Sequence, residues 1–150
     1  AALRALHQDL GLALVTSSAL TRIDACLEAT DLADLFPAAR RFSAQDSLPV
    51  PTSKPDPAVY QLTLRRLGLD PSSAIAVEDA VPGAQSAVAA GIPTVGMLCF
   101  VPADERAQRA EDLQRAGVSA LVDSWDELVA LLRPDGRTPA ADDRGIAVAS

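Results

Sequence analysis

The sequence predicts an α/β protein built on an open, doubly wound parallel sheet. Short apolar runs that suit buried strands alternate along the chain with segments of helical periodicity, and glycine or proline stands at most boundaries. Strands separated by helices pair in parallel through right-handed crossovers, which places helices on both faces of the sheet. In such sheets, binding and catalytic sites lie at the carboxyl ends of the strands.

The first part of the chain reads as a helix followed by a strand. Leu3, Leu6 and Leu10 recur at helical spacing, and Gly11 is expected to end that helix before an apolar strand. In order, the next expected elements are a strand over 12–15, a helix over 19–29, a turn over 32–36 and a short strand over 41–43.

The second part begins after a loop over 45–55. Asp56 is suited to cap a helix whose first turn accepts Pro57 and which should end at Gly68, and Ser124 and Glu127 form a capping box for the last helix. The other expected elements are strands over 74–77, 92–95 and 120–122 and helices over 82–90 and 104–116.

We expect one folded domain over 1–132. The segment 133–150 is rich in proline, glycine and aspartate, so we expect a disordered tail, although Ile146–Val148 is apolar enough to dock somewhere. The chain begins within a helical pattern and without methionine, which suggests that further sequence precedes it.

Composition narrows the function classes. The formal net charge of −7 disfavours nucleic acid as a partner, because phosphate backbones bind clustered cations. No apolar run is long enough for a membrane span, and Cys26 and Cys99 form neither a disulfide framework nor a zinc pattern. We therefore expect a cytoplasmic protein with a small-molecule partner.

Three groups of polar residues fall at predicted strand ends: Thr16 to Ser18, Lys54, and the pair Glu78 and Asp79. The hydroxyl residues are most often helix caps, but they also suit a phosphate oxygen at a helix N-terminus. Lys54 is the only lysine among the 13 basic residues, so either a compact point charge is needed there or its presence is chance.

Glu78 and Asp79 follow a buried apolar strand, where carboxylates need a counterion, a metal or solvent. Oxygen ligands of this kind suit Mg²⁺ together with a phosphate substrate. The alternative is a solvated strand end with Asp79 capping the next helix. Because all three polar groups are predicted at one edge of one sheet, the metal interpretation gains weight.

At these residues the sequence resembles the haloacid dehalogenase superfamily, in the branch of beta-phosphoglucomutase and phosphoglycolate phosphatase. The matching stretches are Leu12 to Ser18, Lys54 to Tyr60, Ala76 to Gly83 and Ala89 to Pro93. The resemblance covers about residues 1–132 and implies a Rossmann-like core.

In catalytic terms, the resemblance implies that Thr16 binds the transferring phosphoryl group, that Lys54 stabilises its charge, and that Asp79 with Glu78 binds Mg²⁺. Ser17 and Ser18 are further candidates for substrate binding. The substrate expected from the resemblance is a small phosphorylated metabolite. The acid pair disfavours the metal-independent dehalogenases of the superfamily.

The sequence departs from this family in one respect. None of its 15 Asp residues lies two positions from another, so the D-x-D motif that carries the nucleophile and the general acid in the family is missing. In the family that motif lies on a first strand between the strands placed here at 12–15 and 74–77. Without that strand and the cap domain, we expect a gap in the sheet, exposed strand edges and self-association.

Several function classes therefore stay open. The chain is either part of an active phosphatase or phosphosugar mutase whose nucleophile lies upstream, or a catalytically inactive remnant that serves as a binding module. An unrelated receiver-like or nucleotide-binding domain is a third possibility. The sequence contains neither GxGxxG nor GxxxxGK[ST], which argues against nucleotide binding.

Overall fold

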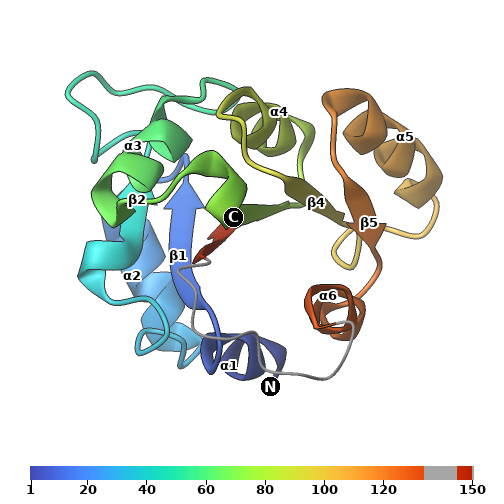
Figure 1. Ribbon diagram of the computed structural model, residues 1–150, viewed down its shortest axis with the longest axis horizontal. Helices are drawn as coiled ribbons and strands as arrows, with labels where there is room; N and C mark the ends of the chain where they lie inside the picture. The colour runs from blue at the N-terminus through green and yellow to red at the C-terminus, as the bar shows by residue number, and fades with distance from the viewer. Residues whose placement is uncertain (134–144, 150) are drawn as a thin grey trace.

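The computed structural model describes residues 1–133 and 145–149. Within them the chain forms a six-stranded sheet in the order β2-β1-β6-β3-β4-β5, and every pair of neighbouring strands is parallel. Helices cover both faces of the sheet (Figure 1). The prediction of an open, doubly wound parallel sheet is confirmed.

The bounds of the elements follow the alternation of apolar runs and helical segments. The strands are β1 (Gly11–Thr16), β2 (Arg41–Ser43), β3 (Ala74–Glu78), β4 (Thr94–Met97), β5 (Ala120–Val122) and β6 (Gly145–Ala149). The α-helices are α1 (Ala2–His7), α2 (Leu20–Ala29), α3 (Ala58–Leu67), α4 (Val81–Ala89), α5 (Arg106–Ala116) and α6 (Trp125–Leu132). Two short 3-10 helices are η1 (Ala38–Arg40) and η2 (Pro71–Ser73).

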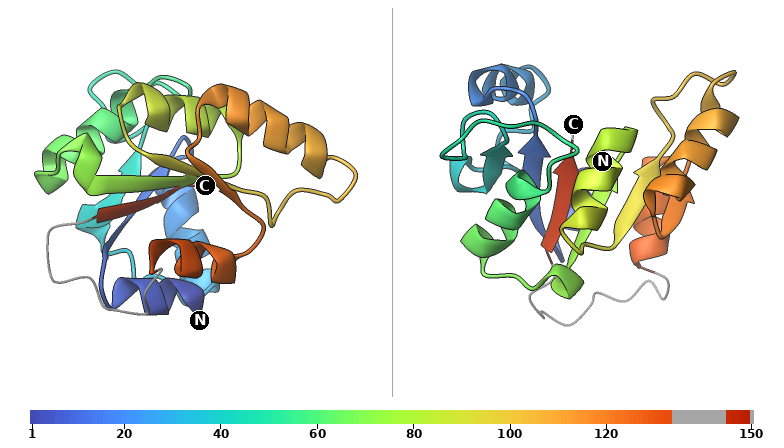
Figure 2. Two further views of the ribbon diagram at one scale, coloured as in Figure 1. Left: turned by 45° about the vertical axis from the view of Figure 1, so that its right-hand side comes forward. Right: turned by 90° about the horizontal axis from the view of Figure 1, so that it is seen from above.

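Successive side chains of the central strands point to opposite faces and enter different cores. Leu12 and Leu14 of β1 pack in a core with residues of α1, α2 and α6. Ala13 and Val15 of the same strand pack in a second core with residues of α3 and α4. Figure 2 shows the sheet between these two helical layers. Both faces of β1 are therefore buried, as its continuous apolar sequence requires.

The ends of helix α3 lie where the local sequence predicts them, whereas one strand, β4, begins later than predicted. Gly68 ends α3 in the left-handed conformation with φ of 65°, and Asp56 Oδ1 accepts a hydrogen bond from the Ala58 N–H at the start of that helix. The strand expected over 92–95 instead begins at Thr94. Its start shifts because Pro93 lacks an N–H, although the Pro93 carbonyl still accepts a bond from Ala76 at 2.9 Å.

The expectation of a disordered tail is wrong for residues 145–149. They form β6, which pairs with β1 from Gly11 to Val15 and with β3 from Ala74 to Val77. The gap expected between these two strands is therefore filled by the end of the chain. An apolar extended segment satisfies the backbone groups of both neighbours, which local composition alone does not reveal. Residues 134–144 and 150 lie outside the described residues.

The helices in the described part of the chain are too short and too polar for any of them to cross a membrane.

Candidate functional site at the carboxyl edge of the sheet

The hydroxyl residues at the carboxyl end of β1 do not cap the helix that follows them. Thr16 is fully buried, and its Oγ1 accepts a hydrogen bond from the Ser18 N–H at 3.0 Å. Ser17 Oγ accepts the Lys54 N–H at 3.0 Å. The first turn of α2 is instead capped from another loop, because the Leu20 N–H donates to Asp46 Oδ2 at 2.6 Å. These hydroxyl residues therefore do not act as caps of α2 in the structure.

Lys54 joins the ends of two strands that do not pair with each other. Its Nζ donates to the Val15 carbonyl on β1 at 3.0 Å and to Glu78 Oε1 on β3 at 2.7 Å. The Lys54 side chain is only 7% exposed. The ammonium also lies 5.3 Å from the centre of the Tyr60 ring, within the range of a cation–π contact. A single compact charge therefore ties the carboxyl end of β1 to that of β3.

Glu78 is buried, and one of its two carboxylate oxygens accepts two hydrogen bonds. Its side chain is 2% exposed, and Oε1 accepts hydrogen bonds from both the Lys54 ammonium and the Tyr60 hydroxyl. Burial raises the pKa of Glu78, and the neighbouring positive charge of Lys54 opposes that rise. Burial also raises the pKa of Tyr60 well above its ordinary value, with the Glu78 carboxylate adding to the effect.

The first turn of α4 lies directly against the Glu78 carboxylate. A Cβ built on Gly83 would lie 1.9 Å from Glu78 Oε2 and 2.4 Å from Glu78 Cδ. Only glycine leaves room for this approach. The N-terminal end of a helix favours negative charge, so its proximity supports the ionised form of the carboxylate.

Asp79 follows Glu78 and is partly exposed. Its carbonyl oxygen accepts a hydrogen bond from Arg109 Nη1 at 2.9 Å, which fixes the backbone at the end of β3 to helix α5. Burial, followed by the negative charge of Asp79, raises the pKa of the nearby Cys99 thiol. Asp79 is thus the residue that directly follows the carboxyl end of β3.

The donor set at this edge fits a magnesium ion only in part. Mg²⁺ is commonly held by one or two carboxylates together with waters and substrate phosphates, and Glu78 and Asp79 supply two carboxylates. Glu78 Oε1 is already occupied by Lys54 and Tyr60, so Asp79 is the more available ligand. Among the described residues, no three acidic, histidine or cysteine side chains gather closely enough to form a complete metal site.

The structure brings together most of the residues chosen from the sequence. Lys54 is the centre of this cluster, because its N–H donates to Ser17 and its ammonium donates to Glu78. Thr16 is adjacent to Ser17 in the chain and accepts the Ser18 N–H. Ser18 takes part through its main chain, since its carbonyl accepts the Ser43 hydroxyl at 2.7 Å. Ser43 is buried and was not chosen from the sequence.

Two further residues of the cluster, besides Ser43, were not chosen from the sequence. Tyr60 is the only tyrosine of the chain and lies in the first turn of α3, where an isolated aromatic residue is usually interpreted as part of the core. Gly83 lies near the start of a helix, where the sequence alone gives a glycine no particular function. Tyr60 follows Lys54 by six residues and Gly83 follows Glu78 by five. These spacings indicate a shared site only when the fold is known to bring both residues to Glu78.

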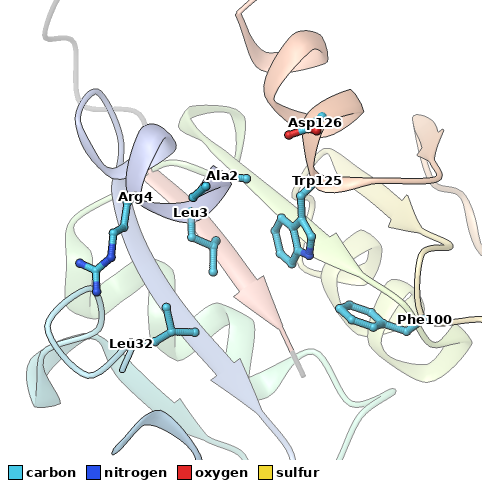
Figure 3. Close-up of a pocket in the computed structure, with 8 residues that line it drawn as sticks. Ala2, Leu3, Arg4, Leu32, Phe100, Trp125 and Asp126 are labelled. Carbon is cyan, nitrogen blue, oxygen red and sulfur yellow. The ribbon is translucent and has the colours of Figure 1, made fainter. Parts of the chain in front are cut away.

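A groove elsewhere on the surface contains none of these residues. It has a volume of about 500 Å³, and Figure 3 shows Leu3, Leu32, Phe100 and Trp125 around it. Its walls come from α1, the start of α6 and the loops after α2 and β4. The side chains facing it are mainly apolar, so it offers no second polar constellation comparable with the cluster around Glu78.

Comparison with known proteins gives the family of the chain. The model of the haloacid dehalogenase-like hydrolase family matches residues 1–91. Protein CbbY of Cupriavidus necator is 41% identical over 87 residues, which cover 57% of this chain and 33% of that protein. A CbbY-like protein of Arabidopsis thaliana is 42% identical over 62 residues, covering 41% of this chain and 19% of its own length. The chain thus spans a third or less of these two curated relatives.

Solved structures agree with this assignment. A haloacid dehalogenase family hydrolase from Deinococcus radiodurans, crystallised with phosphate and sodium, has a TM-score of 0.79 and 29% identity, covering 93% of this chain and 59% of that one. A putative beta-phosphoglucomutase from Thermotoga maritima has a TM-score of 0.73 and 29% identity, covering 89% of this chain and 57% of its own. The chain belongs to the haloacid dehalogenase-like hydrolase family.

Proposed function

We propose that this chain is the C-terminal part of the core of a magnesium-dependent phosphohydrolase that acts on a small phosphorylated metabolite. The observation that carries the proposal is the Lys54 ammonium, which is buried at the carboxyl edge of the sheet and bonded at 2.7 Å to Glu78 beside Asp79. A cation and two carboxylates at this edge suit a phosphoryl group that is bound together with a metal ion.

Each residue has a distinct proposed role. Thr16, with the backbone of Ser17 and Ser18, binds phosphoryl oxygens at the end of β1. Lys54 balances the charge that develops on the phosphoryl group. Asp79 and Glu78 hold Mg²⁺, which when bound neutralises phosphate charge and orients the oxygens.

The nucleophile is proposed to come from a segment upstream of residue 1. Covalent phosphoryl transfer needs a carboxylate that attacks phosphorus and a second group that manages the proton. No D-x-D motif exists in the 150 residues, and the segment 145–149 that fills the centre of the sheet contains only glycine, isoleucine, alanine and valine. The same residues would serve a phosphosugar mutase, in which a sugar hydroxyl instead of water accepts the phosphoryl group.

A second candidate function rests on the same segment. Because β6 occupies the centre of the sheet without an acidic residue, the chain as it stands is also consistent with a catalytically inactive core that serves as a binding module. Under this alternative, the cluster at Glu78 still holds phosphate but does not turn it over.

The test compares turnover with binding. The 150-residue chain is incubated with p-nitrophenyl phosphate and Mg²⁺, and inorganic phosphate binding is measured by calorimetry in the presence of Mg²⁺. We expect phosphate binding that is lost in Lys54→Met, with no turnover. The gene product with its upstream sequence should hydrolyse the ester and lose activity in Asp79→Ala. Turnover by the isolated chain that is abolished in Asp79→Ala would show that the nucleophile has been misassigned.

Failure of the longer product to turn over any phosphate ester, with phosphate binding intact, would favour the binding module instead. Absence of phosphate binding in both proteins would contradict both functions.

A further inference from the structure

Among the described residues, the strand pairing of the two halves of the sheet runs only through β6. β1 pairs with β2 and β6, and β3 pairs with β4 and β6, so among the described residues β1 and β3 share no ladder of their own. Figure 2 shows this red C-terminal strand beside the blue strand β1. The five residues of β6 therefore occupy a slot with a parallel strand on each side.

The walls of this slot are tied together by contacts that do not involve β6. At the carboxyl end, Lys54 Nζ bridges the Val15 carbonyl of β1 and the Glu78 carboxylate of β3, at 3.0 and 2.7 Å. On one face of the sheet, Leu6 of α1 and Leu128 of α6 are fully buried in a shared core. The two walls of the slot are therefore joined by contacts that are independent of β6.

The opposite face is closed in the same way. Helices α3 and α4 lie over it, and Ser86 Oγ of α4 donates to the Asp56 carbonyl before α3 at 2.7 Å. Tyr60 of α3 reaches Glu78 of β3. Both layers that cover the slot are thus joined to both of its walls.

The slot has a specific chemical demand. Residues 11–15 and 74–77 present buried backbone groups to it, and leaving such groups without hydrogen-bond partners costs about 1–3 kcal/mol each. Side chains of a strand in this position face helical layers on both sides, so the part of the occupant that pairs with residues 11–15 and 74–77 is expected to be apolar, and polar residues fit only beyond its carboxyl end. The segment Gly145–Ala149 meets both requirements.

We propose that the space between β1 and β3 is a strand-acceptor site, and that residues 145–149 fill it as a separable ligand tethered to the protein. Residues 145–149 follow α6, which ends at Leu132, in the same chain, so they remain covalently attached to the protein. Because β6 is covalently attached to the rest of the chain, it competes with any free strand for the same place. The site then also accepts the same strand as a free peptide when the tethered copy is disabled.

One consequence rests on the proposed function. The acid-bearing strand that a phosphohydrolase needs is expected between the same two strands, so the C-terminal strand and an upstream strand exclude each other from the slot. The strand-acceptor site itself depends only on the pairing of β6 and stands whether or not the protein is a phosphohydrolase.

The experiment uses the full chain with Ala147→Pro. Ala147 pairs with Ala13 on one side and with Ala76 on the other, and proline at this position lacks the N–H of the ladder and does not fit a central strand. The probe is a fluorescent peptide with the sequence of residues 144–150, measured by anisotropy. We expect the variant to bind it at least about tenfold more tightly than the wild type, in which the tethered strand competes.

Ala103→Pro is the matched control. Ala103 is exposed and follows Pro102 in a turn closed by the Glu105 N–H to the Pro102 carbonyl at 3.0 Å, where proline fits the backbone. This variant should bind the peptide as weakly as the wild type. A peptide with proline in place of its central alanine should bind neither variant.

A folded Ala147→Pro variant that binds no peptide, or that binds the proline peptide equally well, overturns the proposal. If the variant does not fold, hydrogen exchange of the wild type decides: amides of 145–149 that are protected but exchange faster than those of β1 and β3 support a separable strand. Exchange of 145–149 only at the rate of β1 and β3 overturns the proposal. Exchange of 145–149 at the rate of the free peptide overturns it. None of these measurements depends on turnover. Failure of the phosphohydrolase assay can therefore be told apart from failure of the strand-acceptor proposal.

Discussion

At the scale of single residues, the decisive feature is one buried carboxylate with three supports. Glu78 is 2% exposed, accepts hydrogen bonds from Lys54 and Tyr60, and lies against the start of α4. Removing one partner of a buried ion pair leaves an uncompensated charge, which is strongly destabilising. The cluster is therefore sensitive to changes that keep charge but alter shape.

Lys54→Arg tests that sensitivity. The ammonium fits between the Val15 carbonyl and Glu78, and a wider planar guanidinium has no room there because the side chain is 7% exposed. We expect a loss of about 1–3 kcal/mol in the free energy of unfolding, measured by urea denaturation. In a catalytically active longer product, the turnover rate should fall roughly a hundredfold.

Arg65→Lys is the control for this change, because Arg65 is exposed on α3 and a surface exchange of this kind alters stability by less than about 0.5 kcal/mol. Equal stability of Lys54→Arg and the wild type would mean that the compact shape of the lysine is not required.

Gly83→Ala tests the contact between α4 and the carboxylate. The added Cβ would lie 1.9 Å from Glu78 Oε2, so either the helix or the carboxylate must move. We expect a loss of about 3 kcal/mol in the free energy of unfolding, because overpacking of this severity reaches the upper part of the usual range. Thermal unfolding followed by circular dichroism measures it.

Gly11→Ala provides the comparison for Gly83→Ala. Its added Cβ would meet Arg40 Nη1 at 2.8 Å, and the end of a flexible side chain yields easily. The change should cost about 1 kcal/mol or less. Similar losses at both glycines would contradict the special role of Gly83.

At the scale of elements, the helix starts show two ways of satisfying the same backbone groups. Helix α6 is capped locally, since Ser124 Oγ accepts the Glu127 N–H at 3.1 Å and Glu127 Oε2 accepts the Asp123 N–H at 2.7 Å. Helix α2 is capped across the chain by Asp46. Only the first kind is visible in local sequence.

Ser124→Ala removes the local cap. The Glu127 N–H loses its partner, and we expect a loss of about 1 kcal/mol in the free energy of unfolding, measured by chemical denaturation. Ser72→Ala is the matched control, because Ser72 is exposed in η2 and its hydroxyl makes no hydrogen bond among the described residues. An equal effect at both serines would show that the cap contributes nothing.

At the scale of the whole molecule, the sheet depends on a strand from the far end of the chain. β6 supplies the ladder for both β1 and β3, which are buried on both faces. Contacts that are distant in sequence form late and are entropically costly, since a long loop must close first.

Ending the chain after Arg133 removes this strand. We expect the shortened protein to self-associate through the exposed edges of β1 and β3 and to melt at least about 5 °C below the full chain. Size-exclusion chromatography with light scattering, together with thermal melts, measures both properties. A monodisperse monomer with an unchanged cooperative melt would contradict the role given to β6.

The sequence by itself determined the alternation of strands and helices and the polar residues at strand ends. Periodicity, caps and glycine stops are local, so they define α3 and β3 and place Lys54 and Glu78 at one edge. The family resemblance rests on the same short stretches.

The tertiary structure alone decided which distant residues meet. Tyr60 donates to Glu78, Gly83 makes room for that carboxylate, and Asp46 caps α2, although nothing in their own neighbourhood signals these partners. The placement of residues 145–149 is the extreme case, because a short apolar segment after a polar stretch has no local reason to be a central strand. It becomes one because two buried strand edges elsewhere in the chain require hydrogen-bond partners.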